Sequence, residues 1–189
     1  ILTEAESREL TIEWNRTGVE FQKQQTLHES FERQVEKTPN GRALTFEGQH
    51  LTYSELNRRA NQVAHYLKKL GVVPDTLVGL YLERSVEIAV GILGILKAGG
   101  AYLPIDPVYP KDRVAFMLAD AKAPVLLTHS KLAAQLPEHK TKIVCFDQDM
   151  ALIEAEPETN LPQTARPDNL AYVIYTSGST GKSKGTRVT

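Results

Sequence analysis

Apolar positions along the second half of the chain form short uninterrupted runs, and stretches of helical pattern lie between them. The runs occupy residues 77–82, 101–105, 124–128, 142–146 and 170–175. Strands that are apolar throughout are typical of sheets covered on both faces. Helical patterns occupy residues 85–97, 110–119 and 130–136, with Pro110 expected in the first turn of its helix. This alternation predicts an α/β fold with a mostly parallel sheet layered with helices.

The first forty residues are polar and predict two helices. Thr3 with Glu6, and Thr26 with Glu29, match the capping box, in which hydroxyl and carboxylate satisfy free N–H groups at a helix start. The second of these helices is expected to stop near residues 38–39. Residues 1–40 are therefore interpreted as a helical linker or N-terminal segment.

A hairpin and a long amphipathic helix are expected next. Residues 43–46 and 50–53 flank the turn-like triplet 47–49. A third capping box, Thr52 with Glu55, opens a helix that we expect to end before Gly71. Its apolar face is expected to consist of Leu56, Ala60, Val63 and Leu67.

Composition and charge exclude several classes of function. The chain is 41% hydrophobic with a net charge of −1, so no basic excess indicates nucleic acid or an anionic membrane. The apolar run 88–96 is far shorter than the roughly 20 residues of a membrane-spanning helix. The single cysteine, Cys145, is interpreted as a buried strand residue. Without a disulfide framework or a signal peptide, we expect a cytoplasmic protein.

Residues 175–185 carry the strongest chemical signal. They follow an apolar strand and combine glycines, hydroxyls and lysines, which together supply flexible N–H groups, hydrogen-bond donors and positive charge to a polyphosphate. The candidate ATP-binding residues are Thr176, Ser177, Gly178, Ser179, Thr180, Gly181, Lys182, Lys184 and Gly185. A Walker A loop requires glycine where this chain has Thr176, so that motif is excluded. A flexible Gly/Ser linker is the alternative interpretation of the composition.

Other polar residues give weaker signals. The five histidines show no metal-binding spacing, and His65 is expected on a solvated helix face with Asn61 and Lys68. Asp147 and Asp149 are interpreted as a solvated turn, and Asp106 as a turn former. No catalytic residue and no metal ligand is therefore assigned within the chain.

The phosphate-binding signature of adenylate-forming enzymes resembles residues 175–185, YTSGSTGKSKG, although that family usually has proline where this chain has Ser183. The first two core motifs of adenylation domains in non-ribosomal peptide synthetases resemble residues 51–56 (LTYSEL) and 96–106 (LKAGGAYLPID). Both motifs are expected to act structurally, with Gly99 and Gly100 allowing close approach and Tyr102 and Leu103 packing. Residues 14–17 (WNRT) resemble the linker from an upstream condensation domain. The resemblance thus covers essentially the whole chain and places residues 41–189 in the N-terminal part of an adenylation domain.

The resemblance implies a ligase of secondary-metabolite biosynthesis, which forms aminoacyl-AMP from an amino acid and Mg-ATP and then loads a phosphopantetheine thiol. It implies ATP and Mg²⁺, with the magnesium ligands outside this chain. The implied partners are the carrier (thiolation) and condensation domains of the same synthetase, and the resemblance leaves room for an MbtH-like protein.

In the family, the residues that choose the amino acid, bind magnesium and catalyse adenylation follow the phosphate loop. We therefore expect the chain to be a fragment that is inactive alone and does not define the amino acid. Two alternatives remain open. One is a non-catalytic docking or complementing subdomain, favoured by the polar N-terminus with Trp14. The other is a fragment of an acyl-CoA synthetase.

Overall fold

The core of the protein is a six-stranded sheet with the strand order β6-β5-β3-β4-β7-β8. The computed structural model describes residues 2–18, 25–176 and 183–189. All sheet neighbours pair in parallel except β7 and β8, which pair antiparallel. The strands of the sheet are β3 Leu77–Tyr81, β4 Ala101–Pro104, β5 Val125–Thr128, β6 Lys142–Cys145, β7 Tyr172–Thr176 and β8 Lys184–Val188. The predicted α/β class with a mostly parallel sheet is confirmed.

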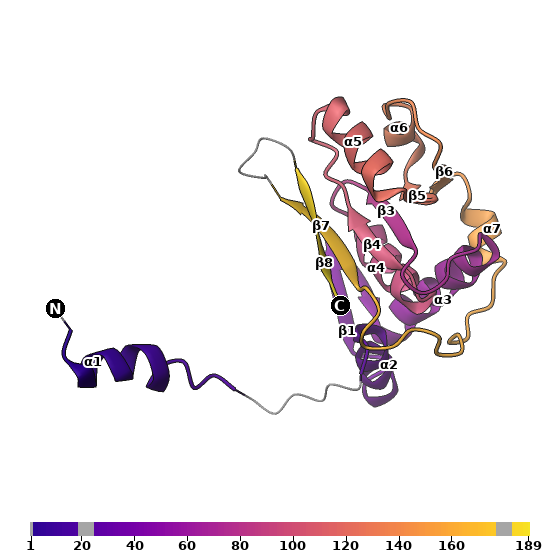
Figure 1. Cartoon of the computed structure of the whole chain (residues 1–189). Coiled ribbons are helices and arrows are strands. Elements are labelled where there is room, and N and C mark those ends of the chain that lie inside the picture. Colours follow the sequence, from indigo (N-terminus) through magenta and orange to yellow (C-terminus); the bar gives the residue numbers. More distant parts are fainter. Residues whose placement is uncertain (1, 19–24, 177–182) are drawn as a thin grey trace.

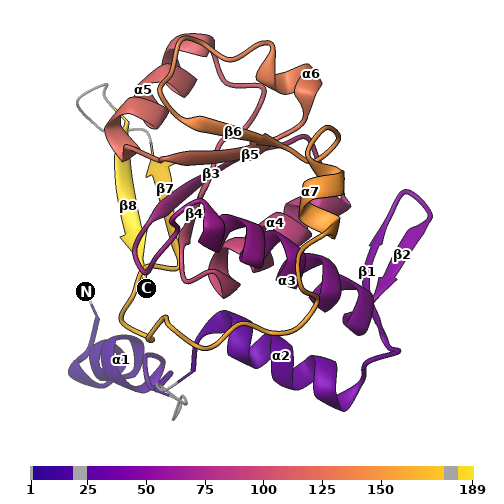
Figure 2. The ribbon, with the colours of Figure 1, turned by 90° about the vertical axis from the view of Figure 1, so that its right-hand side faces the viewer.

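Helices cover both faces of this sheet. Figure 2 shows α5 and α6 on one side of the strands and α2, α3 and α4 on the other. The helices are α1 Glu4–Arg8, α2 Leu27–Lys37, α3 Tyr53–Lys69, α4 Val86–Lys97, α5 Lys111–Ala121, α6 Ser130–Ala133 and α7 Met150–Glu154, and η1 Glu9–Glu13 is a π-helical turn. Among the described residues, no helix is both long and apolar enough to cross a bilayer.

Side chains of the central strands alternate between two apolar cores. In β5, Val125 and Leu127 pack with α3 and α4, whereas Leu126 belongs to the core under α5. Because the strands are buried on both sides, they read as continuous apolar runs in the sequence. Cys145 is buried in β6, as expected.

The N-terminal helix lies apart from the sheet (Figure 1). Its predicted capping box is formed, since Thr3 Oγ1 accepts from the Glu6 N–H at 3.3 Å and the Glu6 carboxylate accepts from the Thr3 N–H at 2.7 Å. Trp14, at its end, is 66% exposed. The capping boxes of α2 and α3 are also present, so all three predicted helix starts are confirmed.

The second of the two glycines before β4 allows the close approach that the sequence predicts. A Cβ on Gly100 would lie 2.9 Å from Val72 Cγ1 and 3.1 Å from the Thr76 carbonyl oxygen. The hairpin of β1 Arg42–Phe46 and β2 Gln49–Thr52 is confirmed as well, with a two-residue turn. Both turn residues have positive φ, which matches the right-handed twist of the strands.

Two local predictions are wrong. Pro110 is the N-cap of α5 with extended ψ of 143°, so the helix begins one residue later than expected. His65 does not lie on a solvated face, because its Nε2 donates to the Thr159 carbonyl at 3.0 Å and its neighbour Asn61 is fully buried. The segment that covers this face is the α7–β7 connection (residues 155–171), which contains no helix or strand.

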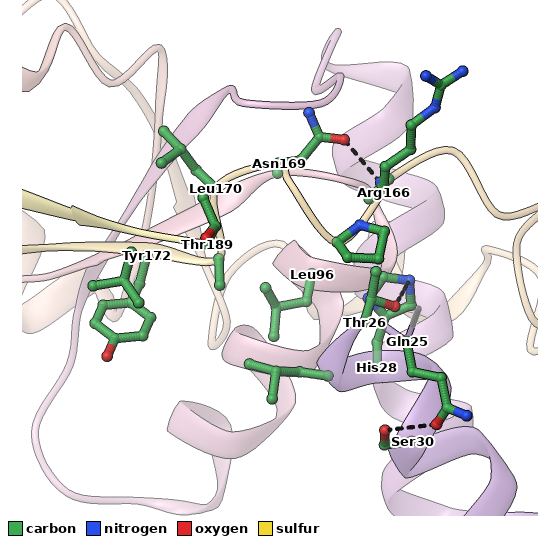
Figure 3. A pocket seen from close by; sticks show the side chains of 16 residues that line it. Gln25, Thr26, His28, Ser30, Leu96, Arg166, Asn169, Leu170, Tyr172 and Thr189 are labelled. Carbon is green, nitrogen blue, oxygen red and sulfur yellow. Dashed lines mark hydrogen bonds between the residues drawn. The ribbon is translucent and has the colours of Figure 1, made fainter. Parts of the chain in front are cut away.

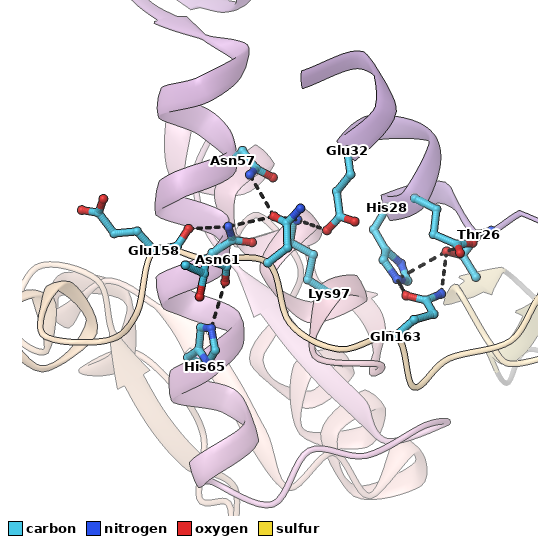
Figure 4. Close-up of polar contacts among 12 residues, drawn as sticks. Thr26, His28, Glu32, Asn57, Asn61, His65, Lys97, Glu158 and Gln163 are labelled. Carbon is cyan, nitrogen blue, oxygen red and sulfur yellow. Dashed lines mark hydrogen bonds and ion pairs between the residues drawn. The ribbon is translucent and has the colours of Figure 1, made fainter. Parts of the chain in front are cut away.

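Polar side chains of two helices hold this α7–β7 connection in place (Figure 4). Asn160 Oδ1 accepts from Asn57 at 2.9 Å, from Asn61 at 3.0 Å and from Lys97 Nζ at 3.2 Å. Lys97 Nζ also forms an ion pair with Glu32 of α2. The network therefore joins α2, α3 and α4 to the segment that leads into β7.

His28 makes the stability of this region dependent on pH. Its buried Nε2 lies 2.8 Å from Gln163 Oε1, which can only accept. Burial is the main cause that lowers the pKa of His28, opposed by the Gln163 hydrogen bond and the charges of Glu32 and Glu29, while Lys97 lowers it further.

A histidine with a lowered folded-state pKa binds its proton more readily in the unfolded chain. Stability is therefore complete above the unfolded pKa of about 6.5 and declines as the pH falls below it. We expect the urea concentration at the midpoint of unfolding to decrease when the pH is lowered from 7.5 to 5. His28→Gln should make this decrease smaller. Equal losses in both proteins would show that His28 is not responsible.

Candidate phosphate-binding site

The candidate loop connects β7 and β8 in the sequence. Thr176 ends β7 and Lys184 begins β8, and these two residues form the last pair of the ladder. Ser177, Gly178, Ser179, Thr180, Gly181 and Lys182 lie outside the described residues. The structure therefore places the two ends of the candidate loop, Thr176 and Lys184, opposite each other. We call this end of the hairpin, next to the candidate loop, the hairpin root.

This hairpin root lies where ligand sites form in α/β proteins. β7 runs parallel to β4, so the residues after both strands emerge at the carboxyl edge of the sheet. After β4, Asp106 Oδ1 accepts from the Val108 N–H at 2.9 Å, which confirms the expected turn. The candidate loop thus follows a strand at the edge where α/β enzymes bind phosphates.

The side chains at the hairpin root are exposed and free to bind a ligand. Residues 174, 176, 184 and 186 share one face of the hairpin because side chains alternate along each strand. Within the described part of the chain, no carboxylate pairs with Lys184. Its ammonium charge is therefore available to an anion held by the loop.

The sequence interpretation misplaced the end of the loop. Tyr175 lies in β7, as the expected strand 170–175 implies, but Thr176 also belongs to β7, and Lys184 and Gly185 belong to an additional strand, β8. A strand was not expected because Lys184 to Val188 (KGTRV) contains a glycine and two cations rather than an apolar run. Residues 184–188 nevertheless form a strand because they pair antiparallel with β7.

Gly185 has a packing role that the sequence did not reveal. It faces the α5 side of the hairpin, where a Cβ would lie 3.1 Å from Val173 Cγ1 and 3.3 Å from Tyr175 Cζ. The absence of a side chain lets the Tyr175 ring cover both strands.

Tyr175 connects the hairpin to α5 and was not singled out from the sequence. Its hydroxyl donates to Asp120 Oδ2 at 2.5 Å, and its ring meets Phe116 edge-on at a centroid distance of 6.2 Å. Burial is the main cause that raises the pKa of Tyr175, and the hydrogen bond to Asp120 adds to it. The phenol therefore stays protonated and remains a donor at physiological pH. Alternation along residues 170–175 is too weak a signal to predict this contact.

The described residues show no cluster of potential metal ligands. They contain no group of three or more His, Cys, Asp or Glu side chains that could hold a metal ion. Asp147 accepts from the Ser130 N–H at the start of α6 at 2.9 Å, and Asp149 accepts from the Cys145 N–H at 2.7 Å, so both carboxylates form hydrogen bonds within the fold. No step of the chemistry is therefore assigned to a metal ligand of this chain.

A cavity of about 740 Å³ lies at the other end of the hairpin (Figure 3). It is lined by the start of β7, the end of β8 and the N-terminal turn of α2, including Tyr172, Thr189 and His28. Ligands of parallel sheets bind at the carboxyl ends of strands, and this cavity lies at the amino end of β7. It is therefore separate from the candidate phosphate site.

Comparison with protein families gives one match over most of the chain. The model described as AMP-binding enzyme matches residues 31–189. One of the linear gramicidin synthase proteins of Brevibacillus parabrevis is 50% identical over 188 residues, which cover 100% of this chain and 4% of that protein. Tyrocidine synthase 3 of the same organism is 46% identical over 189 residues, which cover 100% of this chain and 3% of that protein. The chain thus spans only 3–4% of the length of these two curated relatives.

Solved structures show the same fold. A non-ribosomal peptide synthetase, FmoA3, in its AMPPNP-bound form superposes with a TM-score of 0.84 at 38% identity, covering 93% of this chain and 18% of that chain. Its α-methyl-L-serine-AMP-bound form gives a TM-score of 0.81 at 38% identity, covering 90% of this chain and 19% of that chain. The N-terminal subdomain of NpsA from Klebsiella oxytoca, at 23% identity and a TM-score of 0.76, shares the fold over 87% of this chain and 42% of that chain.

Proposed function

Because the chain belongs to the family of AMP-binding enzymes, we propose that it is the N-terminal part of an amino-acid-activating adenylation domain in a non-ribosomal peptide synthetase. The observation that carries this proposal is the hairpin root, where Thr176 and Lys184 bracket the candidate loop at the carboxyl edge of the sheet, and where Lys184 has no carboxylate partner among the described residues. The relatives that match the whole chain are synthetases of this kind, and a structure similar to it is bound to AMPPNP.

In the proposed reaction, a carboxylate oxygen of the amino acid attacks the α-phosphorus of ATP. The bond from that phosphorus to the oxygen bridging the β-phosphate breaks, and pyrophosphate leaves with the electron pair. Transfer of this kind depends on positioning and on neutralising charge. We propose that residues 176–185 hold the β- and γ-phosphates and that Lys184 stabilises the charge on the leaving pyrophosphate.

The proposed domain acts with others. We assign residues 1–40 to the linker from a condensation domain and residues 41–189 to the adenylation domain itself. The aminoacyl group would pass to the phosphopantetheine thiol of a carrier domain, and an MbtH-like protein is a further candidate partner. ATP-dependent synthesis of this type, together with the lone buried Cys145, supports a cytoplasmic location.

The acceptor of the activated acyl group distinguishes this proposal from its alternatives. We expect the complete parent domain, given Mg-ATP and its amino acid, to form aminoacyl-AMP and to load a holo-carrier domain but not free coenzyme A. Mass spectrometry of the adenylate and of both thiols measures this. Loading of coenzyme A would favour an acyl-CoA synthetase, and the absence of any adenylate would favour a docking module.

The 189-residue chain alone is expected to form no adenylate. It covers 19% of the FmoA3 chain that is bound to α-methyl-L-serine-AMP. Formation of aminoacyl-AMP by the isolated chain in the same assay would contradict this expectation.

A further inference from the structure

The carboxyl end of β7 is only weakly joined to the rest of the sheet. The pairing of β7 with β4 is confined to Tyr172 and Tyr102, at the amino end of β7. There the two rings stack with their centroids 5.2 Å apart. Beyond this point β7 pairs with β8, whose side chains are largely exposed. The ladder alone therefore does not fix the hairpin root.

Side-chain contacts hold the hairpin at both ends instead. Near the amino end of β7, the Asp75 carboxylate accepts from the Leu170 N–H at 2.8 Å and from Asn169 Nδ2 at 2.9 Å. Near the carboxyl end, the Tyr175 hydroxyl donates to Asp120 at 2.5 Å. Tyr175 directly precedes Thr176, so the second contact lies next to the candidate loop.

The α5 helix presents one flank to the hairpin. Phe116 and Asp120, four residues apart, lie one turn from each other on the same side of the helix and both contact Tyr175. Tyr175 is only 8% exposed, and its ring also covers Gly185 of β8. One side chain thus joins both strands of the hairpin root to α5.

We propose that Asp120 is a positioning residue for the phosphate loop, acting through the hydroxyl of Tyr175 to hold the carboxyl end of β7 against α5. The inference rests on the proposed function and deepens it. A charge-assisted hydrogen bond from a phenol to a carboxylate is directional, so it fixes the strand in position as well as attracting it. Loss of this bond is expected to let the carboxyl end of β7, and Thr176 with it, move away from α5 and so weaken the binding of ATP, while the amino acid's own binding residues are unaffected.

The test uses Tyr175→Phe, Asp120→Asn and the double variant in the complete domain. Each single variant is expected to raise the KM for ATP in pyrophosphate exchange by about fivefold to tenfold, the size of one hydrogen bond. The KM for the amino acid should change less than about twofold, and the double variant should be no worse than either single variant. Asp112→Asn, the same change at an exposed position of α5, is the matched control and should behave as the wild type.

A second measurement is independent of activity. Hydrogen exchange of the 189-residue chain should become faster in β7 and β8 of Asp120→Asn, and it should stay unchanged in β3 and β5. Three results would each overturn the inference. They are wild-type KM values for ATP in both single variants, equal changes in the KM for ATP and the KM for the amino acid, and unchanged hydrogen exchange in β7 and β8. A wild-type domain without any pyrophosphate exchange would overturn the proposed function, and this inference with it.

Discussion

Lys184→Ala is expected to lower kcat/KM for ATP in pyrophosphate exchange by about 100-fold in the complete domain. Lys184 opens β8 opposite Thr176, is exposed, and within the described part of the chain has no carboxylate partner. Among the described residues, no ion pair of the Lys184 ammonium has to break before it binds a phosphate. The loss should appear with every amino acid that the domain accepts, because the contact is to ATP.

Two control variants separate phosphate binding from strand structure. Arg187→Ala removes a cation from the same strand, but its side chain lies on the opposite face of the hairpin, so we expect less than about a threefold effect. Lys184→Arg keeps the charge and should retain part of the activity. Unchanged kinetics in Lys184→Ala would remove this residue from the phosphate site, and an equal loss in Arg187→Ala would indicate damage to the strand.

Glu32→Ala is expected to destabilise the folded chain by about 3–5 kcal/mol, the cost of leaving a buried charge without its partner. The Lys97 side chain is 1% exposed and pairs with Glu32, which is itself largely covered. Among the described residues, only Asn160 Oδ1, at 3.2 Å, would remain as an acceptor for its ammonium. Urea unfolding followed by circular dichroism measures the loss.

The expected loss depends on pH in a defined direction. Burial is the main cause that lowers the pKa of Lys97, so the folded state releases this proton more readily than the unfolded chain does. The destabilisation of Glu32→Ala should therefore shrink as the pH rises toward 10, because the uncharged amine tolerates burial.

Matched variants test whether the charge is the cause. Glu36→Ala removes an exposed carboxylate one turn further along α2 and should cost less than about 0.5 kcal/mol. Replacing both partners, Glu32→Leu with Lys97→Met, should recover most of the loss, since it removes the unpaired charge. A cost below about 1 kcal/mol for Glu32→Ala would show that the pair does not matter for stability.

Features with a short-range physical cause were predictable from the sequence. The capping boxes at Thr3, Thr26 and Thr52 are read from residues three positions apart, and the structure forms all three. The buried parallel strands follow from short continuous apolar runs, which are typical of strands covered on both faces. These local rules were enough to predict that the candidate loop directly follows a buried strand.

Features that depend on distant partners were not predictable. Lys97 lies within a motif whose pattern gives no sign that its ammonium is buried, because Glu32 is 65 residues away. His65 was assigned to a solvated face because its cover, the α7–β7 connection, follows it by 94 residues. The same holds for Tyr175, whose acceptor Asp120 lies on α5, 55 residues earlier. Strand β8 exists only because β7 offers an edge to its polar sequence.

Amino-acid-dependent exchange of labelled pyrophosphate into ATP by the complete parent domain tests the central claim most directly. The account predicts exchange with one or a few amino acids, and its loss in Lys184→Ala while the variant stays folded. Exchange that requires no amino acid, or no exchange with any of them, would contradict the assignment of this chain to an amino-acid-activating domain.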